Sequence, residues 1–412
     1  MQTQLADFIR DTPEGKEAES ILRKCVHCGF CTATCPTYQV LGDDLDSPRG
    51  RIYLIKRALE GAPVTEKTRL HLDRCLTCRA CETTCPSGVR YGRLVDIGRA
   101  VVEERTVRSV WDKARRAALA LALPRTWIFG SLLKLGRMVR PLAPARLKKR
   151  IPGKTKPAGV WPAPRHARKM LALAGCVQPA LAPSINAAAA RVLDRLGISL
   201  VQAEGAGCCG ALRFHLNKQD AGRDDMRALI DAWWPRVERG EVEAIVMTAS
   251  GCGVTVKEYA HLLADDPEYR DKAARISSIT KDLIEVIPTE DEVFFAEAPP
   301  HRPKKTRVAF QSPCTLQHGQ QIRGGAEALL ARAGYELVPV EDGHLCCGSA
   351  GTYSLLQPVL STELRARKLA NLLKGEPRVI ATANIGCLSH LQGATQTPVR
   401  HWIELLDEAL AP

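Results

Sequence analysis

The sequence predicts an α+β protein in which a helical N-terminal domain, organised around cysteine loops, is followed by a duplicated α/β domain. Three observations support this prediction: cysteines gather in two runs near the N-terminus, two further cysteine sets recur downstream at a nearly constant offset, and short apolar segments alternate with helical ones from residue 169 onward. With 412 residues, 45% of them apolar and 25% charged, the chain has room for two or three domains and the composition of a globular protein. Wholesale disorder and fibrous repeats are therefore excluded.

The two N-terminal cysteine runs share the spacing C-x2-C-x2-C-x3-C, and each is followed directly by proline. Their members are Cys25, Cys28, Cys31 and Cys35 in the first run and Cys75, Cys78, Cys81 and Cys85 in the second. Helices are predicted around both runs. Ser47 as N-cap and Pro48 at the first helical position begin a helix that ends before Gly61, and residues 91–105 form another.

This spacing is the one that bacterial ferredoxins use for [4Fe–4S] cubes, with three thiolates from one run and the fourth from the other. We therefore predict two clusters with crossed ligands and, because four protein ligands leave no iron open, no catalytic residue at either. The first cluster is assigned to Cys25, Cys28, Cys31 and Cys85, and the second to Cys35, Cys75, Cys78 and Cys81. Two structural zinc sites are the alternative, although zinc ribbons use two C-x2-C pairs without a third cysteine at the same step. Crossed ligation would place the cubes side by side as an electron-transfer pair.

The eight remaining cysteines form two sets of equal layout: a single cysteine, a vicinal pair followed by glycine, and a second single cysteine. The first set is Cys176, Cys208, Cys209 and Cys252, and the second is Cys314, Cys346, Cys347 and Cys387. The offset between them is 138 residues for the first three members and 135 for the last. We predict a third cluster or redox site in at least one set; a zinc ion, a vicinal disulfide and buried thiols are the alternatives. The glycine after each pair is expected to let the backbone approach a cofactor.

Alternating strands and helices predict the same α/β order in both downstream halves. In the first half, strands are expected at 169–174, 198–203 and 244–248, and helices at 184–196 and 221–238. In the second half, strands are expected at 307–311, 336–340 and 379–383, and helices at 325–333 and 360–373. This order is typical of parallel sheets, and the cysteines follow the strands, where α/β sheets place their ligands. Gly205, Gly207 and Gly210 match a dinucleotide-binding loop, but Leu345 replaces the middle glycine in the second copy, so no dinucleotide is predicted.

The positive charge is confined to one segment. Residues 101–170 contain 18 lysines and arginines against 3 acidic residues, whereas the net charge of the whole chain is +13. Two amphipathic helices are expected at about 107–123 and 126–140, followed by a proline-rich linker that ends at residue 168. Tryptophans among leucines and basic residues favour a helix pair on a membrane surface; docking to an acidic partner and a solvated charged face are the alternatives. No recognition motif accompanies the charge, so nucleic acid is not an expected ligand.

The N-terminal residues show no basic segment followed by an apolar one, so we expect no secretory signal and a cytoplasmic location. No apolar run approaches the roughly 20 residues that a membrane-spanning helix needs, so no transmembrane helix is expected. Because thiols stay reduced in the cytoplasm, metal binding explains 16 cysteines better than a disulfide framework does.

The complete pattern resembles the glycolate oxidase iron–sulfur subunit family, in which two ferredoxin motifs precede two CCG cysteine-rich repeats. The resemblance is carried by CVHCGFCTATCPTY, LDSPRGRIYLIK, CLTCRACETTCPSGVRYGRLVDIGR, GCCGALRFHL and CCGSAGTYSLLQP. It implies an electron-transfer subunit of a hetero-oligomeric complex, in which an FAD-containing partner oxidises glycolate to glyoxylate and this chain passes single electrons to a quinone-linked acceptor, peripherally on the inner face of the cytoplasmic membrane. Lactate-utilisation proteins, anaerobic glycerol-3-phosphate dehydrogenase and heterodisulfide reductase have similar layouts and supply the alternative functions.

The chain departs from heterodisulfide reductase at one point. The repeats of that family end in C-x-x-C, whereas Thr255 and Asn384 stand where the additional cysteine of each repeat would be. The fused clusters and the disulfide-reducing activity of that family are therefore in doubt here. The predicted domains are the helical two-cluster domain at 1–105, the basic segment at 106–168, and the two α/β repeats at 169–300 and 301–412.

Overall fold

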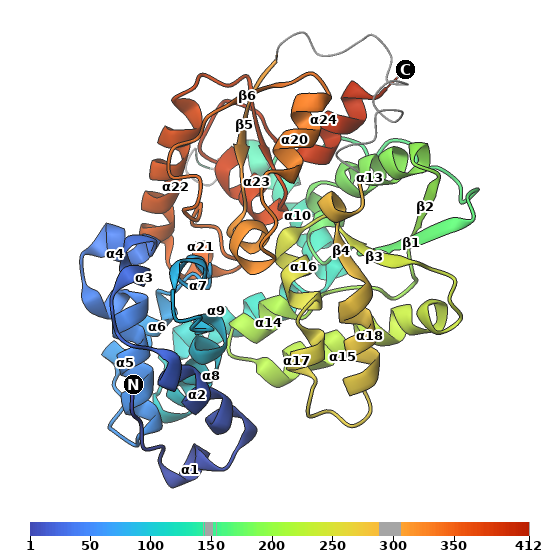
Figure 1. Cartoon of the computed structure of the whole chain (residues 1–412). Coiled ribbons are helices and arrows are strands. Elements are labelled where there is room, and N and C mark those ends of the chain that lie inside the picture. The colour runs from blue at the N-terminus through green and yellow to red at the C-terminus, as the bar shows by residue number, and fades with distance from the viewer. Residues whose placement is uncertain (143, 145–150, 154, 288–305, 412) are drawn as a thin grey trace.

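The computed structural model describes residues 1–142, 144, 151–153, 155–287 and 306–411. Figure 1 shows a helical N-terminal part packed beside two α/β parts, each of which contains one parallel sheet. This mixed architecture confirms the predicted fold class. The predicted divisions at residues 105 and 168 stay predictions, and the boundary between residues 300 and 301 lies outside the described part of the chain.

The N-terminal part consists of short helices joined by the cysteine loops. The helices are α1 (Asp7–Arg10), α2 (Pro13–Lys24), α3 (Phe30–Ala33), α4 (Pro36–Leu41), α5 (Pro48–Leu59), α6 (Glu66–Asp73), α7 (Ala80–Thr84) and α8 (Tyr91–Arg105), with a 3₁₀ turn, η1 (Asp44–Asp46). The predicted cap of α5 is present, because the Gly50 amide donates to the Ser47 hydroxyl at 3.0 Å. Helix α8 packs tightly on α5 at Gly98, where a Cβ atom would lie 2.5 Å from Cγ1 of Ile55.

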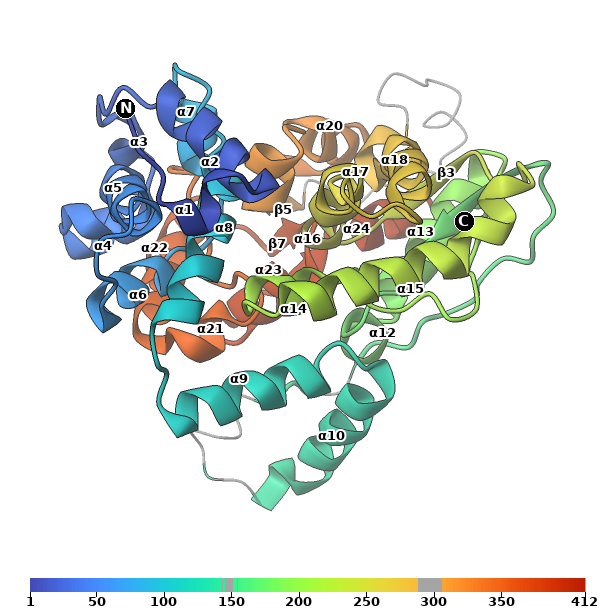
Figure 2. The same ribbon diagram turned by 90° about the horizontal axis from the view of Figure 1, so that it is seen from below.

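The basic segment forms two helices close to the predicted bounds. They are α9 (Val110–Ala122) and α10 (Thr126–Val139), followed by the 3₁₀ turn η2 (Arg140–Leu142). Figure 2 shows this pair as a V that extends away from the sheets, and we call it the hairpin. Two helices of this length are consistent with the sequence pattern because Pro124 falls between them.

The two α/β parts repeat one order of elements. The first contains β1 (Arg168–Ala172), α12 (Gln178–Leu181), α13 (Ser184–Arg195), β2 (Ile198–Val201), α14 (Ala211–His215), α15 (Gln219–Glu238), β3 (Ala244–Met247), α16 (Ser250–Val256), α17 (Tyr259–Leu262), α18 (Arg270–Ile279), β4 (Thr280–Asp282) and η3 (Leu283–Glu285). The second contains β5 (Arg307–Gln311), η4 (Thr315–Gly319), α20 (Gly325–Arg332), β6 (Glu336–Val338), α21 (Tyr353–Leu356), α22 (Pro358–Leu373), β7 (Val379–Thr382), α23 (Ile385–Gln392), β8 (Val399–His401) and α24 (Trp402–Ala409).

Both sheets are parallel and have equivalent strand orders, β2-β1-β3-β4 and β6-β5-β7-β8. In the first sheet Met170 lies opposite Leu200 on one side and Ala244 on the other. Strands such as β3 (sequence AIVM) and β7 (sequence VIAT) are fully buried, as expected where helices cover both faces of a parallel sheet. The edge strands β4 and β8 were not predicted, because they are three residues long and their sequences, TKD and VRH, are largely polar.

The two α/β parts share one hydrophobic core. Helix α13 packs on α24, and Trp402, at the start of α24, is only 1% exposed. Across the same interface His401 Nε2 lies 2.8 Å from the Thr248 carbonyl, and the Ser250 amide donates to the Ala383 carbonyl at 3.2 Å. The carboxyl ends of β3 and β7 therefore meet, and the loops that follow them bring the two downstream cysteine sets close to the contact between the repeats.

Candidate metal centres

Each N-terminal cysteine run begins with a loop of the same unusual backbone conformation. His27 in the first loop and Thr77 at the matching position of the second have φ values of 60° and 51°. Two residues further on, Gly29 and Arg79 have φ values of 89° and 60°. Positive φ is unfavourable for residues with a Cβ atom, and such strain concentrates at functional sites. The matching φ values show that the two runs share one loop conformation.

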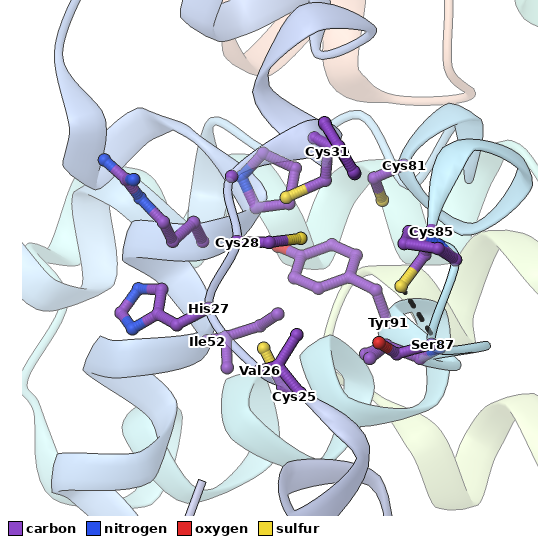
Figure 3. A pocket seen from close by; sticks show the side chains of 16 residues that line it. Cys25, Val26, His27, Cys28, Cys31, Ile52, Cys81, Cys85, Ser87 and Tyr91 are labelled. Atoms are coloured by element: carbon purple, nitrogen blue, oxygen red, sulfur yellow. Dashed lines mark hydrogen bonds between the residues drawn. The ribbon is translucent and has the colours of Figure 1, made fainter.

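The first predicted set lines a pocket in the N-terminal part. The members of this set are Cys25, Cys28, Cys31 and Cys85, which Figure 3 shows around one pocket. Ile52 and Tyr91 form apolar parts of the lining. The amide of Val89 donates to Cys85 Sγ at 3.5 Å, a contact of the kind that stabilises a negatively charged sulfur. Three cysteines of the first run thus share this pocket with Cys85 of the second run, and Cys81 of that run also lines it.

The thiols of this set crowd one another. Burial, together with the charges of Cys25, Cys35 and Cys85, raises the pKa of Cys31 to about 11. Thiolates placed this closely repel one another unless a cation lies among them, and a bound metal removes the thiol protons. A donor set made only of soft sulfur selects iron–sulfur clusters, zinc or Cu(I). The residues present therefore fit a [4Fe–4S] cube.

The second predicted set gathers directly beside the first. Its members are Cys35, Cys75, Cys78 and Cys81. Burial and the thiols of Cys78, Cys75 and Cys35 raise the pKa of Cys81. Tyr91 Oη donates to Cys75 Sγ at 3.6 Å, and the Thr77 amide donates to the same sulfur at 3.4 Å. Because Cys81 also lines the first pocket, the two sets share a wall. The structure brings both crossed sets together, and their role as cluster ligands stays a proposal.

A buried arginine beside the second set was not predicted. Arg51 is 1% exposed, and its Nη1 lies 4.0 Å from Cys35 Sγ. The guanidinium also donates to the His71 carbonyl at 2.7 Å and to the Thr37 hydroxyl at 3.1 Å. Its ion pair with Asp46, at 3.2 Å, is equally buried. The sequence gives no signal that separates this arginine from the exposed ones of the same helix, because only tertiary packing buries it.

The second downstream set is compact. Cys314 Sγ and Cys346 Sγ are 3.8 Å apart, and the thiols of Cys347 and Cys387 lie within hydrogen-bonding reach of each other. The Gly348 amide donates to Cys346 Sγ at 3.4 Å. All four residues are buried or half-buried, and they come from the residue that precedes η4, the loop before α21, and α23. Four converging thiols with a backbone donor fit one metal cluster.

The first downstream set has the same internal order of contacts. Hydrogen bonding to Cys208, followed by burial, raises the pKa of Cys176 well above its usual value. The thiols of Cys209 and Cys252 also lie within hydrogen-bonding reach. The Tyr259 hydroxyl donates to the Cys209 carbonyl at 2.9 Å and holds the vicinal pair in place. Each repeat therefore gathers its four cysteines after its strands, as the sequence indicated.

The glycine after each vicinal pair serves a purpose that the sequence did not predict. Gly210 and Gly348 have φ values of 81° and 86°. A Cβ atom would lie 2.4 Å from the Gly222 carbonyl oxygen in the first case and 2.7 Å from that of Ser361 in the second. In each repeat the glycine therefore lets the backbone pack closely against a later helix, α15 or α22, and its approach to a cofactor stays a prediction.

The hairpin exposes large apolar side chains along both helices. Trp111 is 85% exposed, Trp127 is 73% exposed and Met138 is 72% exposed, with Lys113 and Lys134 on the same helices. Within the described residues no single helix is long and apolar enough to cross a membrane. The pair Val110–Ala122 and Thr126–Leu142, between which the chain bends by 105°, passes this test of length and composition when taken together.

Two protein families and several known proteins are similar to this chain. The family described as a 4Fe-4S dicluster domain matches residues 21–89, and the family described as a cysteine-rich domain matches residues 170–257 and 308–392. The chain is 53% identical over 410 residues to the glycolate oxidase iron-sulfur subunit of Escherichia coli (strain K12), which covers 100% of this chain and 99% of the relative. It is 29% identical over 402 residues to the probable glycolate oxidase iron-sulfur subunit of Bacillus subtilis (strain 168), covering 91% and 89%. Lactate utilization protein A of an Exiguobacterium species is 24% identical over 57% of this chain and 95% of its own length.

Proposed function

The chain belongs to the family of glycolate oxidase iron–sulfur subunits, and from this premise we propose that it carries single electrons from the flavin of an FAD-containing partner to a quinone-linked acceptor while glycolate becomes glyoxylate. The observation that carries the proposal is the pair of four-thiol sets that share a wall in the helical N-terminal part. When bound, a [4Fe–4S] cube supplies one-electron exchange, whereas a flavin can accept a hydride and release electrons singly. This chain therefore needs no substrate site of its own.

Cluster-holding roles follow the crossed assignment. Cys25, Cys28, Cys31 and Cys85 would hold one cube, and Cys35, Cys75, Cys78 and Cys81 would hold the other. Tyr91 supports the second cube by donating to Cys75 Sγ at 3.6 Å and shields the first by lining its pocket. Supporting hydrogen bonds of this kind orient ligand sulfurs and tune the potential of the metal.

The first set is the natural point of entry for electrons from the partner. Cys28 is exposed, and it is flanked by Val26 and Phe30, whose side chains are 69% and 63% exposed. Apolar side chains at the surface beside a redox site are typical of protein docking. We therefore place the FAD-containing subunit against this loop, so that flavin electrons reach the first set before the second.

A disulfide-reducing function at the downstream cysteines has less support. Asn384 Nδ2 donates to Cys387 Sγ at 3.6 Å, and Thr255 Oγ1 donates to the Gly251 carbonyl at 3.2 Å. Hydrogen-bonding side chains thus occupy the positions at which heterodisulfide reductase repeats carry additional thiols. The alternative is that the chain is a subunit of a lactate or glycerol-3-phosphate dehydrogenase. The substrate that the complex oxidises distinguishes these functions.

The hairpin is the surface that we assign to the membrane. Exposed tryptophans beside lysines match an interfacial helix, whose apolar face enters the headgroup region while its cations attract anionic lipid, each contributing about 1 kcal/mol. Trp111 and Trp127 lie on different helices of the bent pair, so each arm exposes a tryptophan. This contact would hold the chain peripherally on the cytoplasmic side, close to a quinone acceptor.

Anaerobic addition of glycolate to the complex of this chain with its FAD-containing partner tests the proposal. We expect the visible absorbance of the iron–sulfur centres to bleach and reduced-cluster EPR signals to appear, with no such change in the isolated chain. Bleaching of the isolated chain by glycolate would contradict the proposal, as would a reduced flavin beside centres that stay oxidised. Faster bleaching with lactate or glycerol 3-phosphate than with glycolate would transfer the function to the alternative.

A further inference from the structure

The two downstream cysteine sets differ in what they face. The second set lies against the second N-terminal set, because one small apolar cluster joins the two parts of the chain. Its buried members are Leu76, Cys346, Tyr353, Leu360 and Leu364, and Cys78 and Cys314 pack against them. Beside this cluster the Thr83 hydroxyl lies 3.0 Å from His318 Nδ1, which fixes α7 against η4.

The pKa of Cys78 reflects the same proximity. Burial, followed by the charge of Cys314, raises it well above its usual value. A cysteine of one predicted cluster site and a cysteine of the second downstream set are thus direct electrostatic neighbours in a buried contact. Electron transfer between redox groups becomes efficient when their ligands approach this closely.

The first downstream set instead faces the hairpin. The Thr126 hydroxyl, at the start of α10, donates to the carbonyl of Gly175, next to Cys176, at 3.5 Å. Arg213 Nε, on the helix that follows the vicinal pair, donates to the Ala120 carbonyl at 3.0 Å. The guanidinium of Arg213 is paired with Asp225 at 2.7 Å, so a carboxylate partly offsets the positive charge on this side of the set.

A buried lysine distinguishes the second set further. Lys368, on α22, is 2% exposed, and its Nζ donates to the carbonyls of Asp342 and Gly343 at 3.2 and 2.9 Å. On the same helix Leu364 belongs to the apolar cluster of Cys346, and Leu369 to that of Cys347. The ammonium group is buried and interacts electrostatically with all four thiols of this set, while carbonyl oxygens bind it and no carboxylate is among its hydrogen-bond partners in the described residues.

The first repeat has no such cation at the equivalent position. Gly222 and Ser361 are equivalent, because the carbonyl of each lies over the glycine after its vicinal pair. Seven residues further along each helix stand Leu229 and Lys368. Leu229 is 1% exposed, so one repeat buries an apolar side chain where the other buries a charge. A charge buried without a carboxylate is costly unless negative groups nearby compensate it.

We propose that the second downstream set, and not the first, holds an iron–sulfur group that exchanges electrons with the N-terminal sites, and that Lys368 balances its negative charge. The inference rests on the proposed function. Cys314, Cys346, Cys347 and Cys387 would be its ligands. In each exchange one centre loses one electron and its neighbour gains it, while no bond forms or breaks and no proton moves. A buried cation favours the reduced, more negative state of such a group.

Iron content in matched variants tests the location. Cys387→Ser and Cys252→Ser change the last cysteine of the second and first sets, and both are measured in anaerobically purified full-length chain. We expect Cys387→Ser to lose about four irons per chain and Cys252→Ser to lose none. Loss of iron from Cys252→Ser, or none from Cys387→Ser, would overturn the inference. If both variants keep about eight irons, the two N-terminal clusters are still present and the proposed function stands. If the unsubstituted chain contains fewer than about eight irons, the proposed function itself is contradicted.

The role of Lys368 is tested by an EPR-monitored redox titration. Lys368→Met should shift the midpoint potential of the third centre to a lower value, and Lys368→Arg should keep it near that of the unsubstituted chain. Leu229→Met is the matched control in the first repeat and should change no potential. If Lys368 only held the Asp342–Gly343 loop, Lys368→Met would lower stability but leave the potential unchanged, and this result would refute the charge-balancing role.

Discussion

Replacing Arg51 with methionine removes a buried cation that lies beside a sulfur of the second N-terminal set. Two unit charges separated by 4.0 Å, the distance from Arg51 Nη1 to Cys35 Sγ, interact with about 4 kcal/mol at an effective dielectric constant of about 20. Asp46, 3.2 Å from the same guanidinium, offsets part of this field, and an added electron would be spread beyond the nearest sulfur. We therefore expect the substitution to destabilise the reduced cluster by about 1.4 kcal/mol, which lowers the midpoint potential of the second cluster by about 60 mV.

The assay is an EPR-monitored redox titration of the anaerobically purified chain. Arg49→Met is the matched control, because Arg49 lines the first pocket but its side chain is 37% exposed, so water screens its charge and the shift should be small. Breaking a buried ion pair costs about 3–5 kcal/mol of folding stability, so Arg51→Lys, which keeps the charge, is measured in parallel and should retain the potential. A higher midpoint potential in Arg51→Met, or a shift no larger than in Arg49→Met, would show that the Arg51 charge does not set the potential of this cluster.

Three further predictions concern the hairpin, the helix packing and the pH dependence. Serine in place of Trp111 and Trp127 should release the chain from vesicles containing anionic lipid in a sedimentation assay, and unchanged binding would assign the membrane contact to another surface. Gly98→Ala should lower the free energy of unfolding in urea by about 1–3 kcal/mol, because its Cβ atom would lie 2.5 Å from an isoleucine carbon of α5; Gly130→Ala, which meets only a distant side-chain carbon at 4.0 Å, should not be destabilising. Burial and a nearby arginine lower the pKa of His390 to about 4, from 6.5, so the unfolded chain takes up the proton first and stability should fall between about pH 6.5 and 4. His390→Gln should flatten this dependence, and an equal loss in both chains would show that other groups cause it.

Features governed by local chemistry could be predicted from the sequence. Ser47 and Pro48 mark the start of α5, and the strand predicted at residues 307–311 has the same bounds as β5. The cysteine spacing also indicated which residues would converge, because the ferredoxin pattern fixes three ligands on one loop and takes the fourth from the other. The first pocket contains such a crossed set.

Features created by tertiary contact could not be predicted. Strands β4 and β8 have too few apolar residues to stand out and exist because a neighbouring strand supplies their hydrogen bonds. The sequence does not distinguish Arg51 and Lys368 from exposed basic residues of helices, because the packing of other elements buries them. The contact between Cys78 and Cys314 joins residues that lie far apart in the sequence, so no local pattern could reveal it.

The proposed function depends on the eight N-terminal cysteines holding two [4Fe–4S] clusters. Iron and acid-labile sulfide analysis of the anaerobically purified chain, with an EPR spin count after reduction, tests it most directly. We expect about twelve irons per chain, about eight from the N-terminal sets and about four from the second downstream set, with an equal amount of sulfide. A folded, colourless chain that contains zinc or no metal would contradict it.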